Sequence, residues 1–258
     1  MKRRIFLHHG LAGLLASAAL TAPLRAAGGL PDSVARVKRS VVGVGTYLQT
    51  RSPATVFAGT GFVVGDGLSV ITNAHVVPDV LDGARKETLG VVVGDGAAVA
   101  FRPATLVGLD REHDLAHLRL QGAPLPVLNL AERDEAREGQ ALAFTGFPLG
   151  MVLGLYPATH RALLAAITPV VRPSLSARGL DARAIAQLQR APFTVYQLDG
   201  TAYPGNSGSP VYDPESGTVL AVVNMVFVKG LKETAITNPS GITYAVPVSH
   251  VRALLQRP

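Results

Sequence analysis

The sequence predicts an all-β protein made of two antiparallel β-barrels followed by a C-terminal helix. Short runs rich in β-branched residues are separated by glycine-containing turns, such as residues 65–67 and 94–96, and this alternation is typical of antiparallel barrels. The chain has 258 residues, of which 48% are hydrophobic and 16% are charged. Such a composition indicates a compact globular body with a substantial core rather than a disordered chain.

The predicted strands fall into two sets of similar size. The first barrel spans about residues 35–125, with strands at 41–44, 61–64, 68–72, 89–93, 104–107 and 115–120. The second spans about residues 139–247, with strands at 141–144, 163–171, 193–198, 209–212, 219–227 and 241–246. A junction at 125–138 joins the barrels, and a helix is predicted for residues 248–256.

One segment inside the second barrel departs from the β pattern. Within residues 179–190, Asp181 is a good helix N-cap, Ile185 and Leu188 recur at helical spacing, and Pro192 follows the run. We therefore expect a short inserted helix. It could act as a flap beside a binding cleft or cover the barrel surface, and we favour the cover because amphipathic stripes are usually packing faces.

The N-terminus has the features of an export signal. Residues 1–26 combine a basic start, an apolar stretch and a small-residue end, which are the three parts of a secretory signal peptide. The arginine pair at 3–4 and the residues after it also fit the twin-arginine pattern. A retained anchor is disfavoured, because the apolar run is shorter than the ~20 residues of a spanning helix. We expect cleavage after Ala26 and a mature chain, residues 27–258, that is periplasmic or secreted.

The net charge of +6 reflects the leader rather than a basic surface. Residues 1–26 contain four of the 24 basic residues and none of the 18 acidic ones, so the remaining chain has 20 basic and 18 acidic residues, a net charge of +2. That balance argues against a nucleic-acid partner. The chain has no cysteine, which excludes disulfides, a thiol nucleophile and cysteine zinc ligands.

Three residues that lie far apart in the chain are of the types that together activate a serine. His75, Asp114 and Ser207 occur in this order. A serine hydroxyl is a poor nucleophile at neutral pH, so it needs an imidazole to accept its proton and a carboxylate to orient that imidazole. His75, Asp114 and Ser207 are therefore the candidate catalytic residues, and Asp110 is the alternative carboxylate.

The glycines around Ser207 predict a tight turn. Gly205 and Gly208 lack the side chains that would crowd such a turn, so backbone N–H groups can point at a reacting oxygen. The N–H groups of Gly205 and Ser207 are the predicted donors of an oxyanion hole, which stabilises the negative charge that develops during attack.

Five motifs resemble the trypsin-like peptidase domain of the HtrA (high-temperature-requirement) proteases and their bacterial relatives. They lie at residues 58–64, 71–77, 114–116, 146–150 and 199–210, and the resemblance spans about residues 35–252. It implies the double barrel of the chymotrypsin and trypsin type, with His75 and Asp114 from the first barrel and Ser207 from the second. It also implies a serine endopeptidase that hydrolyses polypeptides in the cleft between the barrels, without a metal or organic cofactor.

Four departures from the family pattern carry expectations of their own. HtrA proteases usually have a peptide-binding PDZ domain after the peptidase domain, whereas this sequence ends just after it. The stretch 157–197 is longer than the family norm, and Ser209 stands in place of a usual glycine. Asn206 is neutral where digestive trypsins have an aspartate that pairs with a new N-terminal amine, so we expect no zymogen activation of that kind.

The resemblance also assigns three substrate-binding positions, Thr201, Asn224 and Val226. A pocket that selects Lys or Arg needs a buried carboxylate, since an unpaired cation in an apolar site is costly. Thr201 is neutral where trypsins have that carboxylate, and Asp199 matches an acid of HtrA proteases that do not select basic residues. We expect cleavage after small or medium apolar residues, with Val226 narrowing the pocket.

The main alternative belongs to a different class of protein. The chain could be a proteolytically silent protease-fold module that binds polypeptides or acts as a chaperone in the cell envelope, with the loop before Ser207 collapsed. An α/β-hydrolase is disfavoured because strands and helices do not alternate. A metal site at His113 and His117 is disfavoured as well, since four residues of strand span about 13 Å. We expect His160 and His250 to be surface or packing residues.

Overall fold

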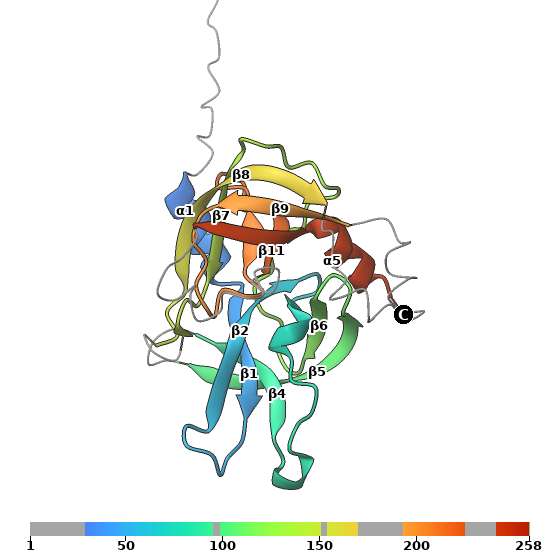
Figure 1. The fold of residues 1–258 in the computed structure, drawn as a ribbon. Helices are drawn as coiled ribbons and strands as arrows, with labels where there is room; N and C mark the ends of the chain where they lie inside the picture. Colours follow the sequence, from blue (N-terminus) through green and yellow to red (C-terminus); the bar gives the residue numbers. More distant parts are fainter. Residues whose placement is uncertain (1–28, 95–98, 151–153, 170–192, 225–240, 258) are drawn as a thin grey trace, which may run out of the picture.

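The computed structural model describes residues 29–94, 99–150, 154–169, 193–224 and 241–257. These residues form two closed antiparallel barrels of six strands each, drawn one above the other in Figure 1. A helix follows the last strand of the second barrel. The fold class predicted from the alternation of β-branched runs and glycine turns is therefore confirmed.

The first barrel closes in the strand order β1-β2-β3-β6-β5-β4. Its strands are β1 (Val41–Tyr47), β2 (Thr55–Val64), β3 (Ser69–Thr72), β4 (Thr88–Val93), β5 (Ala100–Asp110) and β6 (Leu115–Leu120). The short 3₁₀ helices η1 (Ala74–Val76) and η2 (Gly83–Arg85) lie between β3 and β4. All of β3 and all but the last residue of β1 are buried, as expected for short β-branched strands at the centre of a core.

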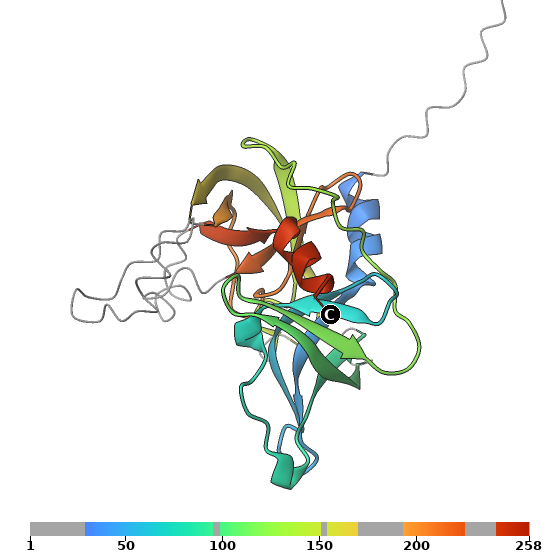
Figure 2. The ribbon, with the colours of Figure 1, turned by 90° about the vertical axis from the view of Figure 1, so that its right-hand side faces the viewer.

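The second barrel closes in the order β10-β11-β12-β9-β8-β7. Its strands are β7 (Ala141–Gly146), β8 (Ala158–Pro169), β9 (Thr194–Asp199), β10 (Pro210–Tyr212), β11 (Val219–Asn224) and β12 (Ile242–Pro247). Helix α5 (Val248–Leu255) continues directly from β12 and buries Val248, Val251 and Leu254. Figure 2 shows α5 against the junction between the barrels, where it contacts both β6 and β11.

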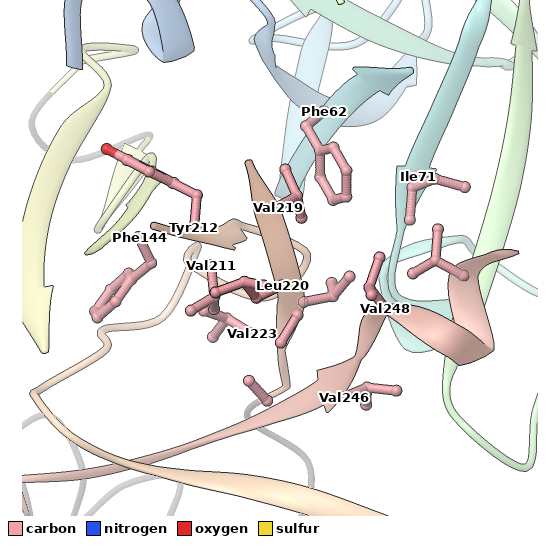
Figure 3. Close-up of a cluster of buried hydrophobic side chains, with 14 of the residues drawn as sticks. Phe62, Ile71, Phe144, Val211, Tyr212, Val219, Leu220, Val223, Val246 and Val248 are labelled. Atoms are coloured by element: carbon pink, nitrogen blue, oxygen red, sulfur yellow. The ribbon is translucent and has the colours of Figure 1, made fainter. Parts of the chain in front are cut away.

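The main hydrophobic cluster joins the two barrels. It contains Phe62 and Ile71 from the first barrel together with Phe144, Tyr212 and Val248 from the second barrel and α5. Figure 3 shows these side chains around the buried strand β11, which is buried along its whole length. Burial of apolar area shared by two units resists their separation, so this cluster fixes the relative position of the loops that meet between the barrels.

Several elements differ from the sequence-based expectation, and strands β2 (from Thr55) and β5 (Ala100–Asp110) are longer than the predicted runs 61–64 and 104–107. Strand β8 begins at Ala158 rather than at residue 163, because residues 158–161 pair with β7 although their side chains are mostly polar. Helix α1 (Leu30–Lys38) has Pro31 in its first turn and buries Val37, and its apolar pattern covers only about two turns, which gives little periodic signal. Ser33 joins α1 to the second barrel by a hydrogen bond to the Glu215 carbonyl (2.8 Å).

Several predicted features lie outside the described residues. These are the leader at 1–26, the inserted helix at 179–190, and Val226. Within the part of the chain that the structure describes, no helix is long and apolar enough to cross a membrane.

Candidate active site

His75 and Asp114 meet between η1 and the start of β6. The Nδ1 atom of His75 lies 2.6 Å from Oδ2 of Asp114, and the His75 backbone N–H donates to Oδ1 at 2.9 Å. Both carboxylate oxygens therefore hold the same histidine. Because a carboxylate only accepts hydrogen bonds, the contact assigns the proton to Nδ1 and leaves Nε2 able to act as a base.

The backbone of Asp114 is held as firmly as its side chain. Its carbonyl accepts hydrogen bonds from the Asn73 side-chain amide (2.9 Å) and from the Ala74 N–H (3.1 Å). Asp114 also has a φ of +55°, a left-handed conformation that is unusual for a residue with a side chain. These bonds tie the turn before β6 to the segment that carries His75, which keeps the carboxylate in place.

Asn224, at the end of β11, contributes to the same carboxylate from the second barrel. Its Nδ2 donates to Asp114 Oδ2 at 2.9 Å, and the residue is fully buried. The resemblance assigned Asn224 to substrate binding, and that role stays a prediction. The structure adds a contact that sequence reasoning missed, because Asn224 and Asp114 are 110 residues apart in the chain.

Ser207 lies in the connection between β9 and β10 and is 7% exposed. Its backbone carbonyl accepts a hydrogen bond from the Thr60 N–H at 2.8 Å. Gly208 has a φ of +86°, and a Cβ there would lie 2.0 Å from the Thr60 carbonyl oxygen, so only glycine fits. Among the described residues the Ser207 hydroxyl makes no hydrogen bond, as is common before substrate tightens such a site.

The loop from Pro204 to Ser207 has each of its carbonyl groups held by a hydrogen bond. The four bonds are Leu149 N–H to Pro204 O (2.8 Å), Thr60 Oγ1 to Gly205 O (2.6 Å), Ser209 N–H to Asn206 O (3.0 Å) and Thr60 N–H to Ser207 O (2.8 Å). Since a peptide group is planar, holding its oxygen also sets the direction of its N–H.

The N–H groups of this loop divide into two kinds. Asn206 donates its N–H to the Tyr203 carbonyl at 2.9 Å. Gly205 and Ser207 make no such bond to any residue in the described ranges. Gly205 has a φ of +101°, and a Cβ would lie 2.3 Å from the Phe147 carbonyl oxygen. The two N–H groups predicted to form the oxyanion hole are therefore the two that are free to bind an oxygen.

Buried polar side chains gather behind Ser207, over Gly146 in β7. A Cβ on Gly146 would lie 2.0 Å from Ser209 Oγ, 2.8 Å from Asn206 Oδ1 and 2.9 Å from Thr60 Oγ1. Within the described part of the chain, the Asn206 amide and the Ser209 hydroxyl have no hydrogen-bond partner. The absence of a side chain at Gly146 makes room for this polar cluster.

The remaining candidate residues lie away from this centre or have other partners. Asp110, the alternative carboxylate, pairs with His113 (2.9 Å) rather than with His75. His160 stacks on Phe144 with ring centroids 4.9 Å apart, and burial lowers its pKa. Near Thr201, Thr243 Oγ1 donates to Gly200 O and accepts from Ala202 N–H. In the described residues no three His, Asp or Glu side chains are grouped to hold a metal ion.

The chain belongs to the trypsin-like peptidase family. The model of the trypsin-like peptidase domain matches residues 59–222, which is more than half of the chain. This range contains His75, Asp114 and Ser207 as well as the free N–H groups of Gly205 and Ser207.

Curated relatives place the chain near the HtrA proteases. The serine protease HTRA2, mitochondrial, of Drosophila pseudoobscura pseudoobscura is 29% identical over 210 residues, which cover 80% of this chain and 40% of that protein. The protein of the same name from Drosophila willistoni is 29% identical over 231 residues, covering 89% and 45%. The resemblance read from the motifs is thus confirmed, and the chain spans less than half the length of these relatives.

Solved structures show the same fold. The active form of the Rv3671c protease from M. tuberculosis is 25% identical with a TM-score of 0.62, covering 86% of this chain and 82% of that chain. The HtrA-type protease AlgW, solved with a tripeptide, is 23% identical with a TM-score of 0.61, covering 89% and 63%.

Proposed function

We propose that this protein is a serine endopeptidase that hydrolyses polypeptides through an acyl-enzyme. Ser207 attacks the scissile carbonyl while His75 takes its proton, and His75 then returns that proton to the leaving amine. Asp114 orients His75 and stabilises the imidazolium as it forms. The N–H groups of Gly205 and Ser207 bind the oxyanion, and water then releases the acyl group by the same steps.

The observation that carries this proposal is the orientation of the peptide between Pro204 and Gly205. Its carbonyl is bonded to the Leu149 N–H (2.8 Å), so its N–H points the opposite way and is free. A collapsed loop would turn this carbonyl into the space that an oxyanion needs. The alternative, a silent binding or chaperone module with a collapsed loop, is therefore disfavoured.

Fluorophosphonate labelling tests the nucleophile. The reagent should add to Ser207 in the wild-type protein and not in Ser207→Ala, with the adduct located by peptide mass spectrometry. Cleavage of an unfolded protein should fall by roughly 10⁴- to 10⁶-fold in Ser207→Ala, because the acyl-enzyme cannot form. Equal cleavage by both proteins would contradict the proposal.

The proposal for substrate and location rests on the sequence motifs. Cleavage after small or medium apolar residues is expected from the neutral Thr201, and a peptide-library profile dominated by Lys or Arg would contradict it.

Export is expected from the arginine pair and apolar stretch in 1–26. N-terminal sequencing of protein from the native cell should then begin near Ala27, and a sequence that starts at Met1 would rule export out.

A further inference from the structure

Thr60, in β2 of the first barrel, contacts the loop from Pro204 to Ser207, called the oxyanion loop below, at two points. Its hydroxyl donates to the Gly205 carbonyl at 2.6 Å, and its backbone N–H donates to the Ser207 carbonyl at 2.8 Å. The residue is fully buried. Of the four carbonyls held in this loop, one is held by a side chain, and that side chain is Thr60.

The Thr60 hydroxyl is itself fixed in direction. It accepts a hydrogen bond from the Phe147 N–H at 3.1 Å, so its single proton is left for Gly205. The Thr60 carbonyl accepts a bond from Thr72 Oγ1 at 2.7 Å, and β2 pairs with β1 at this point. Thr60 therefore presents a donor from a rigid position in the barrel that also carries His75 and Asp114.

Gly205 needs such external control more than other residues do. With no Cβ it can rotate widely about φ and ψ, and its φ of +101° lies outside the range that residues with side chains favour. The Leu149 N–H fixes the peptide before Gly205, and the Thr60 hydroxyl fixes the peptide after it. The Leu149 bond sets the direction of the Gly205 N–H, because that N–H and the Pro204 carbonyl belong to one planar peptide. The Thr60 bond holds the next peptide and so restricts rotation about φ and ψ of Gly205 between the two planes.

We propose that Thr60 is a positioning residue of the oxyanion hole: its hydroxyl holds the Gly205–Asn206 peptide and thereby prevents rotation about Gly205 that would turn the Gly205 N–H away from the transition state. This role rests on the proposed peptidase function and deepens it. The Thr60 contacts also link the two barrels. Through them the first barrel, which carries His75, holds the loop of the second barrel that carries Ser207.

The test compares Thr60→Val, which removes the hydroxyl at nearly constant volume, with Thr60→Ser, which keeps it. Deleting an oxyanion donor itself costs about 10²- to 10³-fold in kcat, so misdirecting one donor should cost Thr60→Val roughly 10- to 100-fold. KM should change little. Thr60→Ser should retain most of the wild-type kcat.

Thr145→Val is the matched control. Thr145 is also fully buried, and its hydroxyl contacts Thr159 Oγ1 (2.8 Å) and the Tyr212 hydroxyl (2.9 Å) but no residue of the oxyanion loop. This variant should lose thermal stability comparable to Thr60→Val while keeping kcat within about two-fold, since it removes a similar buried hydrogen bond elsewhere.

A peptide boronate gives a second measurement that a purely structural role would not move. Its tetrahedral adduct with Ser207 resembles the transition state, whereas a peptide analogue without a carbonyl or carboxylate at the cleaved position has no oxygen for the oxyanion hole to bind. In Thr60→Val the boronate affinity should fall in parallel with kcat/KM, and the affinity of that analogue should stay near wild type. If Thr60→Val does not fold, Thr60→Ala makes the same comparison.

The outcomes separate the two proposals. A wild-type kcat in folded Thr60→Val or Thr60→Ala, or equal losses of kcat in Thr60→Val and Thr145→Val, would overturn the role of Thr60 and leave the peptidase function standing. Full activity in Ser207→Ala, or a wild-type protein without peptidase activity, would overturn both.

Discussion

Two aspartate–histidine pairs have their carboxylates at the turn between β5 and β6, and their surroundings differ. In the pair His75–Asp114, Nδ1 lies 2.6 Å from Oδ2 and the His75 N–H donates to Oδ1. In the pair His113–Asp110, the corresponding distance is 2.9 Å and the His113 N–H donates to Oδ1. The local geometry of the two pairs is therefore almost the same.

The pairs differ in the third group that contacts each carboxylate, Asn224 of the second barrel for Asp114 and Arg257 beyond helix α5 for Asp110. Asp114 receives a neutral donor, the Asn224 amide at 2.9 Å. Asp110 receives a cation, the Arg257 guanidinium at 2.6 Å. A neutral donor orients Asp114 without cancelling its charge, so the charge can stabilise a protonated His75, whereas Arg257 neutralises Asp110.

The two histidines also face different surroundings. The His75 side chain is 28% exposed. The His113 ring stacks on His250 of α5, with centroids 3.8 Å apart, and meets Phe193 edge-on at 4.8 Å. A carboxylate–imidazole contact alone therefore does not single out the proposed catalytic pair. The two pairs differ in the access to the imidazole and in the charge of the third group.

The largest expected effect comes from changing the two aspartates in turn. Asp114→Asn should lose about 10⁴-fold in kcat, because an amide donor favours the wrong tautomer of His75. Asp110→Asn should keep kcat within about ten-fold and lower stability instead, since it touches no reacting group. Steady-state kinetics with thermal melts checks both variants. A larger kcat loss in Asp110→Asn would mean that the two pairs have been assigned the wrong way round.

Removing the neutral donor should have a smaller effect. Asn224→Ala takes one charge-assisted hydrogen bond from Asp114, worth about 1.5–3 kcal/mol, so kcat should fall by roughly 10- to 100-fold. The pH dependence of kcat is the informative measurement. Without the Asn224 hydrogen bond, the Asp114 carboxylate should stabilise the imidazolium of His75 to a different extent, and the pH profile of kcat reports that change. An unchanged kcat would show that the Asn224 contact is dispensable for orienting Asp114.

Removing the cation from the other pair should affect stability rather than turnover. The burial of Asp110 raises its pKa, but the hydrogen bonds from His113 and the charges of His113 and Arg257 outweigh it, so its pKa is lowered overall. Arg257→Leu should cost about 1–2 kcal/mol of unfolding free energy, limited because half of the Arg257 side chain is exposed. Arg111→Leu, which breaks an exposed pair with Asp79, is the control and should change little. A loss of kcat with unchanged stability in Arg257→Leu would contradict the comparison.

The smallest expected effect is a pH dependence of stability from the His113–His250 stack. Burial and the charge of His113 lower the pKa of His250 from its ordinary value of 6.5, against opposing effects of Asp134, Asp110 and Glu112. The folded state therefore binds a proton less readily than the unfolded state. The contribution of neutral His250 to the stability of the folded state is complete above about pH 6.5. That contribution is lost as the pH falls below this value.

His250→Phe tests this dependence because it keeps a ring for stacking but cannot take up a proton. Between pH 7.5 and pH 5.5, the wild-type protein should lose up to about 1 kcal/mol more unfolding free energy than the variant does. Urea unfolding at the two pH values measures it. Activity of both proteins should still fall at acid pH, because protonated His75 cannot accept the Ser207 proton. Identical stability losses in the two proteins would rule out a contribution from His250.

Much of the fold and of the candidate catalytic set could be predicted from the sequence. Glycine turns and β-branched runs act through local backbone preferences, so they indicate the strands of both barrels before any tertiary contact is known. The residue types of His75, Asp114 and Ser207, with glycines beside the serine, indicate the chemistry for the same reason. Helix α1 was missed because its apolar spacing is too short to stand out.

Only the tertiary structure decided how these residues are supported. Asp110 and Asp114 are chemically equivalent and four positions apart, so the fold of the turn had to show which carboxylate meets His75. Thr60 lies in a predicted motif, yet its bond to Gly205 spans 145 residues. Contacts of this kind depend on the closure of both barrels and on their relative position, which local sequence preferences do not encode.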